Sequence, residues 1–191
     1  EAEQGAYGNL HHDDVFSDCK TIIVQPSELN SIEIARELER FYADLAFIFC
    51  VDLILSPVIQ KLLNANINLH LRLSPWYKVG AHCYWPFFFL QPQFAGITFH
   101  RITEKPDAGE IVHQSVPALE YGDKIHDVGA KCVLKAANEI DSLFSYWKKE
   151  HKFKRQLQKS EIEVDEKGIR FPDHSYPWKD HSFIFTLYRT D

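Results

Sequence analysis

The sequence predicts an α/β fold with a doubly wound, mostly parallel sheet and a short C-terminal β appendage. Strand-like and helix-like patterns alternate over residues 20–71, and an unbroken apolar run at residues 45–51 suits a strand covered on both faces. A long amphipathic pattern follows at residues 125–147. Such alternation is typical of parallel sheets, because parallel neighbours need a crossover connection. We therefore expect one principal domain over residues 1–150 and an appendage over residues 151–191.

The first third of the chain predicts two strands and two helices. Residues 20–25, KTIIVQ, predict a strand, and the Pro, Ser and Asn residues that follow predict a turn and a helix cap. Apolar side chains in residues 31–45 recur three and four positions apart, which indicates an amphipathic helix. Residues 45–51 are the buried strand, and residues 56–65 open on Ser-Pro as a short helix that returns the chain to the sheet.

The remaining elements complete the sheet and cover it. Residues 67–71 predict a third strand, and a loop rich in aromatic residues leads to two further strands at residues 96–102 and 111–116. Apolar positions at residues 125–147 trace one face of a helix over about six turns, so this helix should pack along the sheet. Near the C-terminus, alternating residues around 165–168 predict a hairpin within the appendage.

Composition restricts the classes of partner. The net charge of -6 and the pI near 5.9 argue against nucleic acid, because binding its backbone needs clustered Lys and Arg. No apolar run is long enough to span a bilayer, and the N-terminus lacks the basic start and apolar segment of a signal peptide. The four cysteines form no CxxC pair, and we expect them to be reduced in a cytoplasmic protein.

Asn68 and His70 are the first candidate functional residues. They lie two positions apart in an otherwise apolar strand, so their side chains share one face, about 7 Å apart, at the carboxyl end of the strand. Ligands of open α/β sheets bind at that edge. The alternative interpretation is that both are hydrogen-bonded polar residues at a strand end.

Longer motifs support the functional interpretation. The segments NLHLRLSPWYKVG, GITFHRI and DAGEI together resemble the 10-formyltetrahydrofolate-dependent formyltransferase family, whose signature is Asn-x-His in a strand with an Asp downstream. The resemblance covers about residues 20–147 and implies a formyltransferase fold of Rossmann type. It also implies a catalytic triad of Asn68, His70 and Asp107.

The same resemblance implies a folate pocket. ADLAFIFCVDLILSP is similar to the strand and loop that line this pocket in the family. The residues that the resemblance places around the cofactor are Asp52, Leu53, Ile54, Leu55, Thr103 and Glu104. No GxGxxG or GKS/T loop occurs, which argues against a dinucleotide or ATP enzyme. The formyl donor that the resemblance implies is 10-formyltetrahydrofolate.

The triad has a clear chemical interpretation. When an amine attacks the formyl carbon, an amide N–H from Asn68 can stabilise the oxyanion, and His70 can donate to it or exchange a proton near neutral pH. Asp107 can hold the imidazolium and act as general base. A metal site is the alternative, but no His or Cys pair here has a recognised ligand spacing, so we expect no metal. His100 and His113 are interpreted as hydrogen-bonded structural residues.

The resemblance leaves the acceptor open. The sequence after His70 is similar to that of formyltransferases acting on nucleotide-linked amino sugars, which favours such an amine over methionyl-tRNA or glycinamide ribonucleotide. A formyltetrahydrofolate hydrolase and a non-catalytic folate- or nucleotide-binding module are the alternatives. The expected partners are a small-molecule amine and, as an open option, a second copy of the chain. The chain contains no Met and starts after the strands with which such families begin, so we expect N-terminal strands to be missing.

Overall fold

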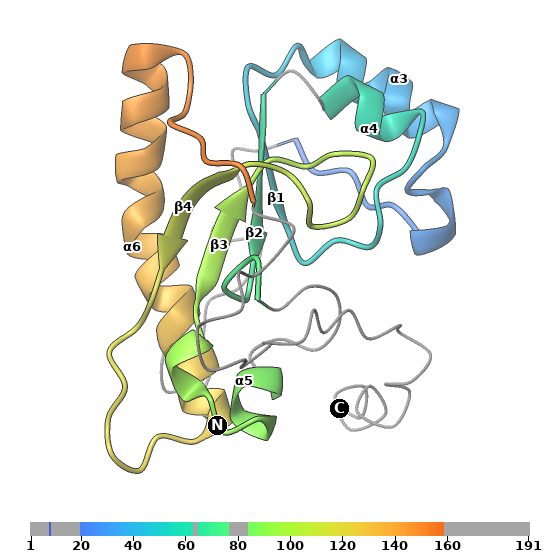
Figure 1. Ribbon diagram of the computed structural model, residues 1–191. Helices are drawn as coiled ribbons and strands as arrows, with labels where there is room; N and C mark the ends of the chain where they lie inside the picture. The colour runs from blue at the N-terminus through green and yellow to red at the C-terminus, as the bar shows by residue number, and fades with distance from the viewer. Residues whose placement is uncertain (1–7, 9–19, 63–64, 77–83, 159–191) are drawn as a thin grey trace.

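A mixed sheet forms the centre of the molecule. The computed structural model describes residues 8, 20–62, 65–76 and 84–158. Within them the sheet has the order β1-β2-β3-β4 (Figure 1). The strands are β1 (Ala46–Phe49), β2 (Asn66–His70), β3 (Ile97–His100) and β4 (Ile111–Ser115). The predicted α/β class is confirmed, and four of the five strands predicted within residues 20–116 are present.

The strand directions follow from the connections. β1 and β2 are parallel. The connection between them contains α4 (Val58–Leu62) and returns the chain to the end of the sheet at which β1 began. β3 is antiparallel to both β2 and β4, because the chain leaves β2 and re-enters β3 at the same edge, and a loop joins β3 directly to β4. The parallel arrangement expected from the sequence therefore applies to β1 and β2, and the second half of the described sheet is antiparallel.

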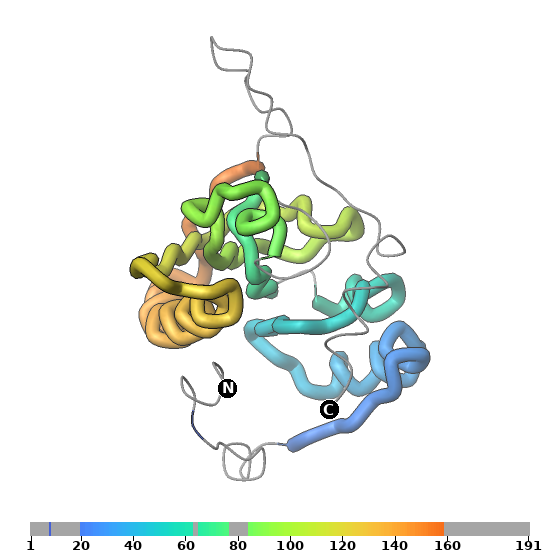
Figure 2. Tube along the Cα trace, turned by 90° about the horizontal axis from the view of Figure 1, so that it is seen from below, coloured from blue at the N-terminus to red at the C-terminus, as the bar shows by residue number. Residues whose placement is uncertain are grey.

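Helices lie on two sides of this sheet. α3 (Ile32–Phe41) begins where the Ser31 hydroxyl accepts a hydrogen bond from the backbone N–H of Ile34, as the predicted cap requires. Figures 1 and 2 show α6 (Ile125–Glu150) alongside β3 and β4, with α3 and α4 on the β1 side. α5 (Tyr84–Phe88) precedes β3. None of the helices in the described part of the chain is both long and apolar enough to cross a bilayer.

The hydrophobic core lies between α6 and one face of the sheet. Alternate residues of β2 and β3 supply the sheet side of this core, and a stripe of α6 supplies the helix side. The buried members of the two layers are Ile67, Leu69, Ile97, Phe99, Val128, Cys132 and Ala136. Because successive strand residues face opposite sides, Asn68 and His100 lie on the sheet face turned away from α6.

Three predictions of local structure differ from the observed fold. Residues 20–25 form no strand, although their β-branched pattern predicted one. Phe47 and Phe49 on β1 are 39% and 40% exposed, so this strand is not covered on both faces. α5 arises within the aromatic loop, where no helix was predicted. The hairpin predicted around residues 165–168 lies outside the described residues.

The chain after α6 packs against the sheet. His151 ends the helix in a left-handed conformation, and Phe153 then enters the core with 7% of its surface exposed. Gln156 forms a pair of 2.8 Å backbone hydrogen bonds with Ile111 at the start of β4. Residues 151–158, which the sequence assigned to the appendage, therefore join the body formed by the preceding elements.

Candidate active site

The pairing of β2 with β3 brings the first candidate residues together. Asn68 lies opposite His100, and His70 lies opposite Thr98, so all four residues share the face turned away from α6. The amide Nδ2 of Asn68 is 3.1 Å from Nε2 of His100. The sequence prediction that Asn68 and His70 project together at the carboxyl end of a strand thus agrees with their placement.

The hydrogen bonds of His100 define its protonation. Its Nδ1 lies 2.9 Å from the carbonyl oxygen of Arg101, which can only accept, so Nδ1 carries the proton. Burial lowers the pKa of His100, and the hydrogen bond to Arg101 and the charge of Asp107 offset this only in part. His100 is therefore neutral, and its Nε2 accepts the hydrogen bond from Asn68.

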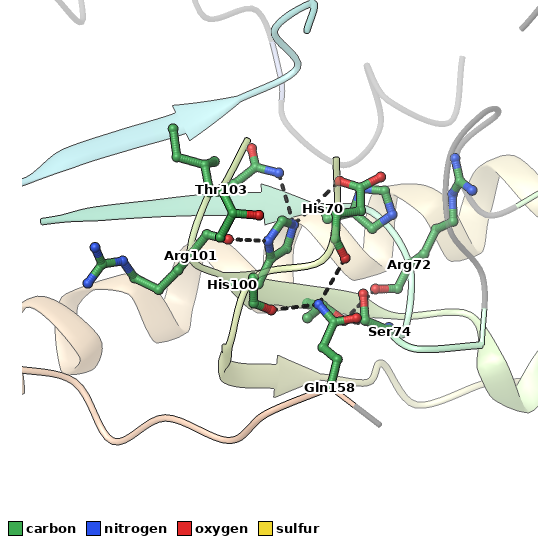
Figure 3. A network of polar contacts seen from close by, with 12 residues as sticks. His70, Arg72, Ser74, His100, Arg101, Thr103 and Gln158 are labelled. Atoms are coloured by element: carbon green, nitrogen blue, oxygen red, sulfur yellow. Dashed lines mark hydrogen bonds and ion pairs between the residues drawn. The ribbon is translucent and has the colours of Figure 1, made fainter. Parts of the chain in front are cut away.

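Asp107 faces both imidazoles. Its Oδ1 lies 3.6 Å from Nδ1 of His70 and 3.6 Å from Nε2 of His100. The two rings meet edge to face with centroids 5.8 Å apart, and Figure 3 shows them side by side on neighbouring strands. The side chains of His70 and Asp107 are 14% and 18% exposed, so the carboxylate reaches the rings in a partly desolvated space. The structure thus brings the three residues of the predicted triad together and adds His100.

The backbone around Asp107 is held in an unusual conformation. Asp107 has a φ of 49°, in the left-handed region that non-glycine residues seldom occupy. Gln158, in the segment after α6, donates from its Nε2 to the carbonyl oxygens of Asp107 and Gly109, at 2.9 and 2.7 Å (Figure 3). A Cβ at Gly109 would lie 1.7 Å from the Arg101 carbonyl oxygen, so only glycine permits this close approach.

The loop that follows His70 is fixed in a similar way. The Thr98 hydroxyl donates to the Arg72 carbonyl oxygen at 2.6 Å and accepts from the Ser74 backbone N–H at 2.9 Å. Gln114 donates to the Ser74 carbonyl oxygen at 2.7 Å. These contacts hold the backbone that follows β2 against β3 and β4. The position of His70, at the end of β2, is fixed as a result.

A cavity of about 100 Å³ adjoins these residues. Asn68, His100 and Asp107 form one part of its wall. Four of the residues predicted to bind the cofactor also line it, namely Asp52, Leu53, Ile54 and Thr103. The other two, Leu55 and Glu104, lie outside the lining. The predicted pocket residues thus gather beside the triad, with these two exceptions.

Asn30 holds the loop that carries part of this lining. Its side-chain amide donates to the carbonyl oxygen of Leu53 at 2.9 Å and accepts from the backbone N–H of Leu55 at 2.7 Å. Leu55 thus helps to hold the loop through its backbone N–H, while its side chain is not part of the cavity lining. The sequence identified the loop but gave no sign that an asparagine before α3 anchors it.

His100 is the site residue that sequence reasoning missed. It was interpreted as structural because a single histidine within a strand most often makes only hydrogen bonds. The missing information was the strand register, since only the pairing of β2 with β3 places His100 opposite Asn68. A prediction of the antiparallel pairing of β2 with β3 would have found it.

Comparison with known proteins gives a consistent picture. A family model described as formyl transferase matches residues 2–140. The formyltransferase PseJ from Anoxybacillus kamchatkensis, solved with UDP-4,6-dideoxy-4-formamido-L-AltNAc and tetrahydrofolate, is 20% identical with a TM-score of 0.59. The alignment covers 78% of this chain and 72% of PseJ.

Two further solved structures extend the comparison. A 4-N formyltransferase from Francisella tularensis is 26% identical, with 66% of this chain and 50% of that chain covered and a TM-score of 0.53. A formyltetrahydrofolate deformylase from Pseudomonas syringae is 22% identical, with 78% and 54% covered and a TM-score of 0.56. This chain thus spans only about half the length of these two proteins. The family match, in contrast, extends over most of the chain, and on that basis the chain belongs to the formyl transferase family.

Proposed function

We propose that this chain transfers a formyl group from 10-formyltetrahydrofolate to a primary amine. The observation that carries the proposal is the approach of Asp107 to His70, at 3.6 Å, beside a cavity that Asn68 and Asp107 both line. Membership of the formyl transferase family supports the reaction class. The three side chains supply the donor, the proton carrier and the base that acyl transfer to an amine requires.

Asn68 is suited to stabilise the oxyanion. Attack of the amine on the formyl carbon moves negative charge onto the former carbonyl oxygen. The amide of Asn68 has two N–H bonds, and one of them already points at Nε2 of His100. This hydrogen bond holds the amide plane in place, so the second N–H is oriented before the substrate binds. Such preorganised donors lower the barrier because they need not reorient during reaction.

His70 and Asp107 are suited to move protons. Formation of the new C–N bond makes the attacking amine acidic, and Asp107 can accept its proton directly or through water. His70 can donate to the oxyanion from the other side of the reacting carbon. When the intermediate collapses, the bond from the formyl carbon to the folate nitrogen breaks, and the released proton returns to that nitrogen. The three residues then regain their initial states.

The cavity is the proposed position of the pteridine ring of the donor. Its lining combines the apolar side chains of Leu53 and Ile54 with the polar side chains of Asp52 and Thr103. Flat heterocycles bind where apolar surfaces meet a few fixed polar groups. Leu55 and Glu104 remain part of the proposal at the rim, because both belong to the loops that carry the lining residues.

A nucleotide-linked amino sugar is the proposed acceptor. The segment from His70 to Pro75 has the form expected of enzymes acting on such sugars, and the negative charge of the chain disfavours a tRNA. PseJ, which shares the fold, was solved with a UDP-linked formamido sugar. The segment from His70 to Pro75 is the observation that favours the sugar over glycinamide ribonucleotide as the acceptor.

One assay separates the proposed function from its alternatives. The protein is incubated with 10-formyltetrahydrofolate alone and with a panel of UDP- and dTDP-linked amino sugars, glycinamide ribonucleotide and methionyl-tRNA. Tetrahydrofolate release is followed by absorbance, and formylated products are identified by mass spectrometry. We expect release only with an amino sugar, together with a product heavier by one formyl group in place of a hydrogen.

The other outcomes each identify a different function. Tetrahydrofolate release that proceeds equally without any amine identifies a hydrolase, and formylation of another acceptor corrects the substrate class. Binding of the folate without turnover identifies a non-catalytic module. Asp107→Asn is the control in every incubation, because it removes the proposed base while keeping the shape of the side chain.

A further inference from the structure

His70, His100 and Asp107 form a cluster that the proposed formyl transfer does not fully explain. Formyl transfer uses His70 and Asp107, but it gives no chemical task to the second imidazole. One ligand atom from each of the three residues lies within 4.8 Å of the others. Among the described residues this is the one such group of His, Cys, Asp and Glu side chains. In contrast to the expectation from the sequence, we propose that these three residues bind a divalent transition-metal ion, with Zn²⁺ as the preferred ion.

Two of the three ligand separations are close to those of a tetrahedral ion. Zinc bonds to imidazole nitrogen and carboxylate oxygen are about 2.0–2.2 Å long, so two ligands of one ion lie about 3.4 Å apart. Oδ1 of Asp107 is 3.6 Å from Nδ1 of His70 and 3.6 Å from Nε2 of His100. All three ligand atoms lie within 4.8 Å of one another, so side-chain rotation has to shorten the remaining separation, between the two imidazole nitrogens, before all three can bond one ion.

The surrounding hydrogen bonds prepare His100 as a ligand. Metal-binding histidines usually donate the N–H of the other ring nitrogen to a carbonyl or carboxylate, which fixes the tautomer. His100 does this already, because its Nδ1 is 2.9 Å from the Arg101 carbonyl oxygen and its lone pair is on Nε2. The ring is 1% exposed and cannot swing away. Its Nε2 now accepts from Asn68, and a flip of that amide would turn an oxygen toward the ion instead.

The ligand set selects the kind of ion. Two imidazoles and one carboxylate suit Zn²⁺ and similar transition metals, whereas Mg²⁺ and Ca²⁺ prefer oxygen ligands. Three protein ligands leave a fourth position open, and here the adjoining cavity, lined by His100 and Asp107, provides space for it. Bound zinc would occupy the atoms of His70 and Asp107 that formyl transfer needs. The ion should therefore inhibit the proposed reaction, and only this consequence rests on the proposed function.

Direct binding tests the site without reference to activity. The full chain, stripped with a chelator, is titrated with Zn²⁺ by calorimetry, and Co²⁺ is added separately to record the visible absorption of a tetrahedral site. The test variants are Asp107→Asn and His100→Gln. The control variants are His113→Ala, a histidine on β4 that pairs with Glu139, and a joint change of His11 and His12 to Ala near the N-terminus.

The expected result is one tight Zn²⁺ ion per chain in the parent and in both controls. Each test variant should bind Zn²⁺ at least about 10-fold more weakly, because even the loss of a supporting residue costs about 10- to 100-fold. In the test variants the visible absorption of bound Co²⁺ should disappear as well. Mg²⁺ should not displace Zn²⁺ from the parent protein. Unchanged Zn²⁺ affinity in either test variant would overturn the proposal, as would loss of binding in a control. If His100→Gln does not fold by circular dichroism, Asp107→Asn alone decides.

Activity then separates this proposal from the proposed function. Free Zn²⁺ at a concentration far above the Kd measured by calorimetry should abolish formyl transfer, and a chelator should restore it. If the protein binds Zn²⁺ but the metal-free protein transfers no formyl group, the metal site stands and the proposed function is refuted. Formyl transfer that is unaffected while Zn²⁺ is bound would refute the assignment of the ion to these three residues.

Discussion

At the scale of single residues, the amide of Asn68 makes two different contributions. One N–H donates to the buried Nε2 of His100, and the other is the proposed donor to the oxyanion. Asn68→Ala removes both. We expect kcat for formyl transfer to fall about 100- to 1000-fold, as on loss of one oxyanion donor elsewhere. Steady-state kinetics with the proposed amino-sugar acceptor provides the measurement.

The same substitution should also lower stability slightly. His100 would keep a buried Nε2 without a donor, which costs about 1–3 kcal/mol of unfolding free energy. Asn138→Ala is the matched control, because Asn138 is exposed on α6, far from the site in the fold. Equal kcat values for the two alanine variants would contradict the role of Asn68.

Sequence alone predicted part of the site, and the missing part has a physical cause. Asn68 and His70 could be identified because a period of two along one strand is a local property. Asp107 was found only through resemblance to a family motif. His100 and Gln158 could not be found, since their positions depend on strand register and on the path of the chain after α6. Contacts between segments far apart in the sequence leave no periodic pattern in either segment.

At the scale of elements, Glu139 fastens α6 to β4. It accepts a hydrogen bond from Nε2 of His113 at 3.0 Å and pairs with Lys135 at 2.9 Å. Burial by itself raises the pKa of Glu139, but the polar contacts of its carboxylate, chiefly those with Lys135 and His113, outweigh burial and lower the pKa from 4.5 to about 2. The ionised carboxylate therefore stabilises the folded chain above the unfolded pKa, near 4.5, and this stabilisation disappears as the pH falls toward 2.

Glu139→Gln should remove this pH dependence. At pH 7 we expect a loss of about 1–2 kcal/mol of unfolding free energy, a value reduced for partial solvent screening. The difference between variant and parent should shrink as the pH falls from about 5 to about 2. Urea unfolding at several pH values measures it. Glu120→Gln, at a side chain 76% exposed, is the control and should change stability little. A difference that stays constant with pH would contradict the assignment.

Gln158 connects the segment after α6 to the loop of Asp107. Its two hydrogen bonds to the carbonyl oxygens of Asp107 and Gly109 hold a backbone conformation with a φ of 49°. In Gln158→Ala the carboxylate should lose its fixed position. We expect a fall in kcat of about 10- to 100-fold, because small displacements of a reacting group are costly. The KM for the folate should remain nearly unchanged.

Leu157→Ala provides the matched control for Gln158→Ala. Leu157 is the preceding residue and is 75% exposed, so its loss should not disturb the loop. Gln158→Glu offers a second comparison, because it keeps the size of the side chain but removes the N–H donors. A normal kcat in Gln158→Glu would exclude the two hydrogen bonds as the cause.

Elements were predictable where the pattern is local and long. α3 and α6 appeared in the sequence because apolar residues repeat at the helical period, and Ser31 marked a start. Residues 20–25 carried a strand-like composition without becoming a strand, since a strand needs a partner as well as propensity. α5 was missed because its five residues span little more than one turn, too few for any periodicity to emerge.

At the scale of the whole molecule, Phe99 tests the packing on which the site rests. It is fully buried between the sheet and α6, in the layer directly behind the polar face of β3. Phe99→Ala should lower the unfolding free energy by about 3–5 kcal/mol through the lost burial and the cavity left behind. Chemical denaturation measures the change, and Tyr121→Ala, at a fully exposed ring, is the control. A loss similar to that of the control would contradict the assignment of the core.

The alternation of β3 ties this core to the chemistry. Phe99 faces α6 while its neighbour His100 faces Asn68, and one insertion within the strand would exchange their directions. A benzyl group would then fill the candidate site, and an imidazole would be buried among apolar side chains. A single in-frame codon added there would thus disrupt the core and the candidate site together. Related sequences should therefore differ in length between the strands far more often than within a strand.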